Sequence, residues 1–384
     1  MVGSQSVRDY TGVQANESKI LTRDLFLEPD DFVMSIERYS ISLTSIIGWG
    51  RRIDRKNDYV AQIALGVMEH VNWVVPGRYL LDTIPALAKL PSFIYRWPSQ
   101  IKAGGKVSMR YFYMLSQEGS RAQVPSFAQR LLKSQEAEGL SDTEVATLTA
   151  NLIGGGVDTT TSTMLSCILA MCSFPEVQRK AQAEIDAVVG TDRSPDWEDV
   201  DQQLSYMAAL VKETLRWRTV TTLGGLPHSS HSDYEYNGYF IPAGTPLISN
   251  MWAIHRHARD FPDPDDFRPE RFLEGKHKRP YPNSKGLNPF GWGRRQCSGQ
   301  PLAEQGLRYS LTRILWAFDL KPGLDENVSI CLNLFWPLEL ILISLIVRRA
   351  GRSDWIFLPT ATRKIRALCH SRLDLSRGLR QLRT

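Results

Sequence analysis

The feature that most restricts the fold of this chain is a glycine-rich segment with a single cysteine near its end. Residues 290–299 read Phe-Gly-Trp-Gly-Arg-Arg-Gln-Cys-Ser-Gly, and Pro301 follows where the first turn of a helix is expected. Cys297 therefore stands where a loop enters a helix. Backbone N–H groups and a helix N-terminus stabilise a thiolate, and glycines let the chain run close to a flat ligand. These are the needs of a cysteine bound to haem iron, whereas a lone buried cysteine is the ordinary alternative.

A second segment combines a long predicted helix with residues that oppose helix formation. Residues 141–144, Ser-Asp-Thr-Glu, have the spacing of a capping box, and the helix is expected to run to about Phe174, just before Pro175. Within it, residues 154–161 read Gly-Gly-Gly-Val-Asp-Thr-Thr-Thr. Each mid-helix glycine costs about 1 kcal/mol relative to alanine. Because no lysine follows the glycines, a phosphate loop is excluded. The small residues either leave room for a ligand at a local distortion or form a close helix-packing contact.

Two charged motifs precede the cysteine segment. Glu213 and Arg216 lie three residues apart and share one helix face, and residues 267–272 read Phe-Arg-Pro-Glu-Arg-Phe. Taken alone, the first pair predicts an ordinary surface ion pair that is worth a few tenths of a kcal/mol.

The remaining pattern predicts a mainly α protein with a small β-sheet region. Apolar residues recur at helical spacing between residues 10 and 140, and further helices are expected at 175–189 and 206–217. Aromatic residues flank Asn237-Gly238, which predicts a β-hairpin over residues 234–241.

Composition narrows the classes of protein without selecting one. The five cysteines are odd in number and none has Cys-x-x-Cys spacing, which argues against a disulfide framework and a structural zinc site. The net charge of +5 fits an acidic partner as well as nucleic acid.

The first 19 residues contain no apolar run, so no signal or anchor is expected there. Residues 331–347 are almost wholly apolar but include Pro337 and Glu339, which favours a buried segment or an unnatural tail over a transmembrane helix.

The cysteine segment resembles the cytochrome P-450 signature Phe-x-x-Gly-x-Arg-x-Cys-x-Gly at every fixed position. The resemblance implies the cytochrome P-450 fold and haem b (iron protoporphyrin IX), with Cys297 as the axial ligand of the iron. It implies that Arg295 binds a haem propionate and that Phe290, Gly293 and Gly299 belong to the haem-binding loop.

The other motifs occur in the order that this family shows. Residues 155–159 resemble its oxygen-activation motif, Ala/Gly-Gly-x-Asp/Glu-Thr, which implies that Asp158 and Thr159 relay protons through water. The resemblance also implies that Arg271 joins Glu213 and Arg216 in a buried network on the proximal side of the haem pocket.

His228 resembles the family's propionate-binding position after the Glu-x-x-Arg helix, although the spacing is one residue longer than usual, with Gly224-Gly225 as the insertion. A solvated loop histidine is the alternative. His255 and His257 lie in a polar segment, and neither is assigned a metal.

The resemblance spans residues 10–325 and is closest to fungal, microsomal-type members. It implies a monooxygenase of secondary metabolism that uses O2, a small apolar substrate and an NADPH-cytochrome P-450 reductase, with no nucleic-acid partner. It also implies that the protein is located at the cytosolic face of the endoplasmic reticulum membrane. We expect a partial haem domain over residues 1–328 and an atypical tail over 329–384. The family's first helices and its Trp-x-x-x-Arg helix have no counterpart in this sequence, so a haem-binding remnant without turnover is the alternative function, and an incomplete or misassembled gene model is expected.

Overall fold

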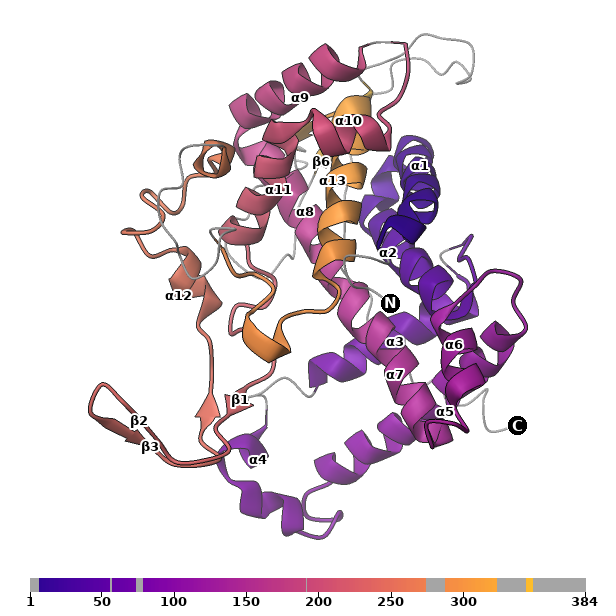
Figure 1. The fold of residues 1–384 in the computed structure, drawn as a ribbon, viewed down its shortest axis with the longest axis vertical. Helices are drawn as coiled ribbons and strands as arrows, with labels where there is room; N and C mark the ends of the chain where they lie inside the picture. Colours follow the sequence, from indigo (N-terminus) through magenta and orange to yellow (C-terminus); the bar gives the residue numbers. More distant parts are fainter. Residues whose placement is uncertain are drawn as a thin grey trace.

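The structure is a computed structural model, and it describes residues 7–55, 57–73, 79–190, 192–273, 287–322 and 343–347. This part of the chain is mainly helical, as predicted (Figure 1). Its α-helices are α1 (Thr11–Leu27), α2 (Phe32–Trp49), α3 (Tyr59–Trp73), α4 (Leu80–Thr83), α5 (Trp97–Ser120), α6 (Phe127–Ser134), α7 (Asp142–Gly156), α8 (Asp158–Ser173), α9 (Pro175–Val189), α10 (Trp197–Gln202), α11 (Ser205–Trp217), α12 (Met251–His255) and α13 (Gln300–Ala317). Short 3-10 turns cover Val7–Tyr10, Pro29–Asp31, Pro85–Lys89, Pro269–Phe272 and Gly293–Arg295.

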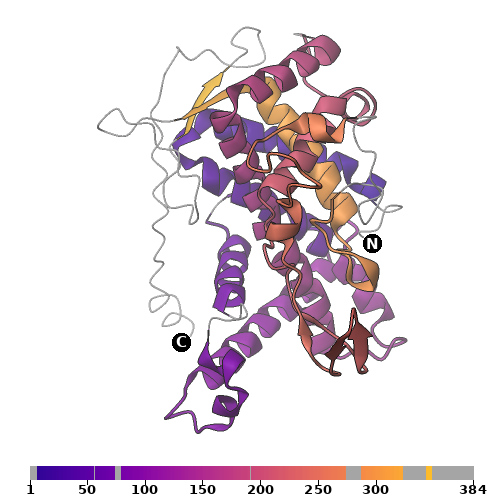
Figure 2. The same cartoon turned by 90° about the vertical axis from the view of Figure 1, so that its left-hand side faces the viewer.

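The small β region predicted from the sequence is also present. Its strands form three antiparallel pairs within the described residues: β1 (His228–Ser229) with β4 (Pro246–Leu247), β2 (Tyr234–Tyr236) with β3 (Tyr239–Ile241), and β5 (Phe318–Pro322) with β6 (Ile343–Val347). The hairpin predicted around Asn237-Gly238 is confirmed, because Tyr236 pairs with Tyr239 and both turn residues have positive φ angles of 50° and 80°. In Figures 1 and 2 this hairpin lies at the edge of the helical body.

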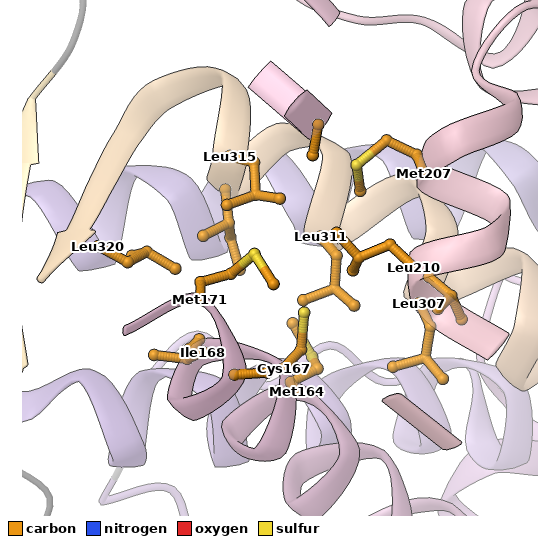
Figure 3. Close-up of a cluster of buried hydrophobic side chains, with 14 of the residues drawn as sticks. Met164, Cys167, Ile168, Met171, Met207, Leu210, Leu307, Leu311, Leu315 and Leu320 are labelled. Carbon is orange, nitrogen blue, oxygen red and sulfur yellow. The ribbon is translucent and has the colours of Figure 1, made fainter. Parts of the chain in front are cut away.

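The main core lies where α8, α11 and α13 meet. Figure 3 shows the side chains that fill it: Met164, Cys167, Ile168 and Met171 from α8, Met207 and Leu210 from α11, Leu307, Leu311 and Leu315 from α13, and Leu320 from β5. The N-terminal end of α13 is held as well, since Gln14 of α1 donates to the carbonyl of Leu302 at 3.0 Å. The helix that follows the cysteine segment is thus part of the rigid centre of the molecule.

The long helix expected over 141–174 is two helices in the structure. The capping box is confirmed, because Glu144 N donates to Ser141 Oγ at 3.3 Å and Ser141 N donates to the Glu144 carboxylate at 2.8 Å. The helix then breaks at Val157, whose φ and ψ of −84° and −71° separate α7 from α8. One uninterrupted helix was therefore wrong, while the predicted local distortion is present beside the three glycines.

The C-terminal predictions fall mostly outside the described residues. The expected domain boundary at 328 lies there, as does most of the apolar run 331–347. The last five residues of that run form β6, which is a strand and not part of a helix. Among the helices that the structure describes, we find none with the length and apolar character needed to span a membrane.

Candidate functional site

The cysteine segment forms a closed loop that leads into α13. The N–H of Cys297 donates to the carbonyl of Phe290 at 2.9 Å, and the N–H of Gly291 donates to the carbonyl of Asn288 at 3.1 Å. Gly291 and Gly293 have φ angles of 71° and 65°, a backbone region that residues with a Cβ rarely adopt. Glycine is therefore required at both positions for the loop to fold back on itself.

Cys297 differs in its surroundings from the two other described cysteines. Its side chain is exposed, whereas Cys167 and Cys172 are buried in α8. Burial raises the pKa of both α8 thiols to about 12, so neither is suited to be a thiolate at neutral pH. Cys331 and Cys369 lie outside the described residues. Cys297 alone among the described thiols is accessible, and it stands three residues before the first residue of α13.

The loop residues fit a flat ligand beside the Cys297 thiol. A Cβ built on Gly291 or Gly293 would have no atom within 4 Å, so the space next to both is open. A Cβ on Gly299 would lie 3.7 Å from Cys297 Sγ, which is an ordinary contact. Since α13 begins immediately afterwards, its N-terminal dipole favours negative charge on the sulfur. An accessible thiol, open glycine surface and a helix N-terminus are together what a haem thiolate needs.

The other residues expected to bind haem are placed as follows. Phe290 is half-buried and packs on the main core. Arg295 is exposed and ends the 3-10 turn Gly293–Arg295. His228 is exposed in β1, opposite Leu247. The propionate-binding roles of Arg295 and His228 stay predictions.

The glycines at the α7–α8 break serve two different purposes. A Cβ on Gly156 would overlap Cγ2 of Thr44 in α2, so this glycine makes the close helix-packing contact that was the alternative interpretation. Gly154 and Gly155 have nothing within 4 Å of such a Cβ. The open surface of the helix is therefore at these two glycines, next to the break.

Asp158 and Thr159 open α8 directly after the break, and both are half-buried. The Thr159 hydroxyl donates to the carbonyl of Gly155 at 2.6 Å, which spans the distorted turn. Burial raises the pKa of Asp158 above its usual range, so its carboxyl is a better proton carrier near neutral pH than an exposed aspartate. An alcohol and such a carboxyl on one helical turn can pass protons to and from water.

Glu213, Arg216 and Arg271 meet in one network. Arg216 Nε and Nη2 donate to the two carboxylate oxygens of Glu213 at 2.7 and 2.8 Å, and Arg271 Nε donates to Oε1 at 3.3 Å. The backbone N–H of Arg268 adds a fourth bond to this carboxylate, to Oε1 at 2.8 Å. Glu213 and Arg216 are 0% and 1% exposed, so this is a buried ion pair and not the surface pair that its spacing alone would suggest.

The network continues to His255, which sequence reasoning missed. Arg216 Nη1 donates to the backbone carbonyl of His255 at 3.0 Å, and the imidazole itself is buried and hydrogen-bonded to Thr219 and Asn288. Its two partners are 36 and 33 residues away, so no local pattern could have shown the contact.

Comparison with known proteins gives one consistent result. The family model described as Cytochrome P450 matches residues 31–342. Cytochrome P450 monooxygenase 58 of Postia placenta is 34% identical over 330 residues, which cover 83% of this chain and 62% of that protein. Cytochrome P450 monooxygenase 253 of the same fungus is 34% identical over 322 residues, covering 81% and 61%. Cytochrome P450 monooxygenase drtD of Aspergillus calidoustus is 35% identical over 315 residues, covering 81% and 57%. The chain thus spans about three fifths of the length of these relatives.

Proposed function

The chain belongs to the cytochrome P450 family, and from that membership we propose that it is a haem-thiolate monooxygenase that inserts one oxygen atom from O2 into a small apolar organic substrate. The observation that carries this proposal is the placement of Cys297. It is an accessible thiol at the entrance of a core helix, on a loop whose glycines leave open space beside it.

Members of this family bind haem b, and the residues of the cysteine loop fit that cofactor. Bound haem supplies an iron centre for activating O2. The chain's own contribution begins with the Cys297 thiolate, whose charge is favoured by the α13 N-terminus. The closed loop from Phe290 to Cys297 fixes where that sulfur lies.

Proton delivery is the second task that we assign to this chain. Monooxygenation consumes protons as one oxygen atom leaves as water, and these protons have to reach the site in order. We assign the transfer to Asp158 and Thr159, with ordered water between them and the oxygen atoms. The open surface at Gly154 and Gly155 gives such water room next to both side chains.

The buried network around Glu213 has a structural task in this proposal. It ties α11 to the backbone of residues 264–268 and to Arg271, all of which precede the cysteine loop in the chain. We assign it the support of the proximal side of the haem pocket, with Arg295 and His228 as partners of the haem propionates.

We further propose that an NADPH-cytochrome P450 reductase supplies the electrons, that the product belongs to secondary metabolism, and that the protein works at the cytosolic face of the endoplasmic reticulum membrane. The similarity to fungal cytochrome P450 monooxygenases supports these assignments.

The decisive experiment combines haem binding with turnover. Purified chain is loaded with haem, its ferrous carbonyl spectrum is recorded, and NADPH-dependent oxidation of an alkoxycoumarin probe is measured with a fungal reductase. A thiolate-type Soret band together with oxidised product supports a monooxygenase. A thiolate band without product from any of a panel of apolar probes, with electron transfer to the haem shown independently, would favour a haem-binding remnant. Absence of haem binding would refute both.

A further inference from the structure

His255 is the last residue of α12 and is fully enclosed, at 0% exposure. The ring of Phe261 meets the imidazole edge-on at 6.1 Å, and Arg216 from α11 donates to its backbone carbonyl at 3.0 Å. A buried histidine needs a partner for each ring nitrogen, because an unpaired one would cost free energy. Both nitrogens of His255 have such a partner.

The two partners fix the protonation of the ring. The backbone N–H of Asn288 donates to Nε2 at 3.2 Å, so Nε2 is the unprotonated nitrogen. The proton is therefore on Nδ1, which donates to Thr219 Oγ1 at 2.7 Å, while the Thr219 hydroxyl donates to the carbonyl of Leu215 at 3.0 Å. Burial and the positive charge of Arg216 lower the pKa of His255 to about 4, in agreement with a neutral ring.

The Asn288 end of this link is where the cysteine loop starts. Asn288 gives its N–H to His255 and its carbonyl accepts the N–H of Gly291, so both backbone groups of this residue are engaged. Two residues later, Phe290 accepts the N–H of Cys297. A single imidazole thus joins the segment that follows α11 to the loop that carries the thiol.

We propose that His255 is a positioning residue for Cys297, acting as a neutral hydrogen-bond acceptor that holds the backbone of Asn288 and, through it, the start of the loop. The effect of this contact on haem ligation by Cys297 rests on the proposed function. It makes the Glu213 network and the cysteine loop one connected unit, in which Arg216 fixes the backbone of His255 and its imidazole fixes the loop.

The acceptor at Nε2 can be tested separately from the donor at Nδ1. In His255→Gln the amide oxygen reaches the position of Nε2 and can still accept from Asn288. In His255→Asn the shorter amide reaches only the position of Nδ1, so the bond to Thr219 is kept and the bond to Asn288 is lost. His257→Gln is the matched control, because His257 is exposed and lies two residues further on.

The first readout is amide hydrogen exchange at Asn288, Gly291 and Cys297 in the haem-free chain. We expect exchange about tenfold faster in His255→Asn, and near-parent exchange in His255→Gln and His257→Gln. The second readout, in haem-loaded protein, is the share of the ferrous carbonyl adduct with a thiolate-type Soret band. This share should fall in His255→Asn and be restored in His255→Gln.

Several outcomes would overturn the proposal. Equal protection in His255→Asn and the parent would show that the loop does not depend on the acceptor, and equal loosening in His255→Gln and His255→Asn would show that only the packing of the ring matters. If His255→Asn does not fold, Thr219→Val decides instead. It removes the partner that keeps the proton on Nδ1, so the same three amides should exchange faster, and parent-like exchange would contradict the proposal. Since the exchange experiment needs no haem, failure of the proposed function would appear separately, as a parent chain without a thiolate band.

Discussion

Arg216 binds both carboxylate oxygens of Glu213, with Nε to Oε2 at 2.7 Å and Nη2 to Oε1 at 2.8 Å, and neither side chain reaches solvent. The remaining nitrogen, Nη1, donates to the carbonyls of His255 and Pro264. A buried charge pair contributes little net stability when intact, but the loss of one partner leaves the other buried and uncompensated. The pair is therefore a point where a single substitution should have a large effect.

Glu213→Gln should lower the free energy of unfolding by about 3 to 5 kcal/mol, because the Arg216 cation would remain buried without a counter-charge. Urea unfolding of the haem-free chain measures this. Lys180→Gln is the control, because it breaks the ion pair between Lys180 and Glu270. The Lys180 side chain is 57% exposed, so its replacement should cost no more than about 1 kcal/mol. Similar costs for the two variants would show that burial of the Glu213 network does not determine its contribution.

Cys297→His should abolish the thiolate-type Soret band of the ferrous carbonyl adduct, since an imidazole donates less electron density to iron than a thiolate does. Cys172→Ala removes a different thiol, one that is buried in α8, and should keep the band. An unchanged spectrum in Cys297→His, or a lost band in Cys172→Ala, would show that the ligand is not Cys297.

Thr159→Ala should leave haem content and substrate binding close to those of the parent while product formation falls and hydrogen peroxide release rises. The reason is that the variant loses the hydroxyl that we assign to proton transfer, while its backbone remains helical. The ratio of product to NADPH consumed measures the effect. Thr160→Ala, at the next position of α8, should keep the parent ratio. If Thr159→Ala also kept it, the protons would travel by another route.

The sequence predicted those local structures whose residues are neighbours in the chain. The cysteine loop, the capping box at Ser141 and the Asn237-Gly238 turn each depend on contacts within a few residues, and the structure has all three. The resemblance to a known family added the pairing of Glu213 with Arg271, whose Nε and Oε1 atoms lie 3.3 Å apart. Spacing alone could not have given a contact across 58 residues.

Contacts between distant segments explain what the sequence could not show. Three adjacent glycines look alike in the chain, yet only Gly156 faces Thr44 of α2, while Gly154 and Gly155 face open space. His255 was placed in a polar segment and given no role, although its imidazole is buried and hydrogen-bonded to Thr219, just after α11, and to Asn288, just before the cysteine loop. Both facts depend on how distant segments pack, and the periodicity of apolar residues along the chain does not indicate such contacts.

Gly156→Ala and Gly154→Ala should change stability in opposite directions. The added methyl group at position 156 would meet Thr44, which cannot easily rotate away because its hydroxyl donates to the carbonyls of Ser40 and Ile41 and its side chain is buried. We expect a loss of about 1 to 3 kcal/mol. At position 154 the methyl group meets nothing, so the better helix propensity of alanine should add about 0.5 to 1 kcal/mol. Thermal unfolding of both variants would check this, and equal shifts would contradict the packing assignment.

The neutral state of His255 predicts how stability depends on pH. Burial lowers the pKa of its imidazole from 6.5 to about 4 in the folded chain. Between these values the unfolded chain takes up a proton that the folded chain does not, so the contribution is fully present above pH 6.5 and is lost as the pH falls towards 4. The expected size is about 3 kcal/mol.

His255→Gln removes this titration but leaves an acceptor for Asn288, so its unfolding free energy should fall less steeply than that of the parent between pH 6.5 and pH 4. Glu37→Gln provides a control of opposite sign. Burial raises the pKa of Glu37 from 4.5 to about 7, so its contribution is present below pH 4.5 and is lost as the pH rises through 7. Its replacement should therefore remove the loss of stability that the parent shows as the pH rises from 4.5 to 7. Urea unfolding at several pH values measures both differences, and a His255→Gln curve parallel to that of the parent would mean that folding does not change the pKa of the imidazole.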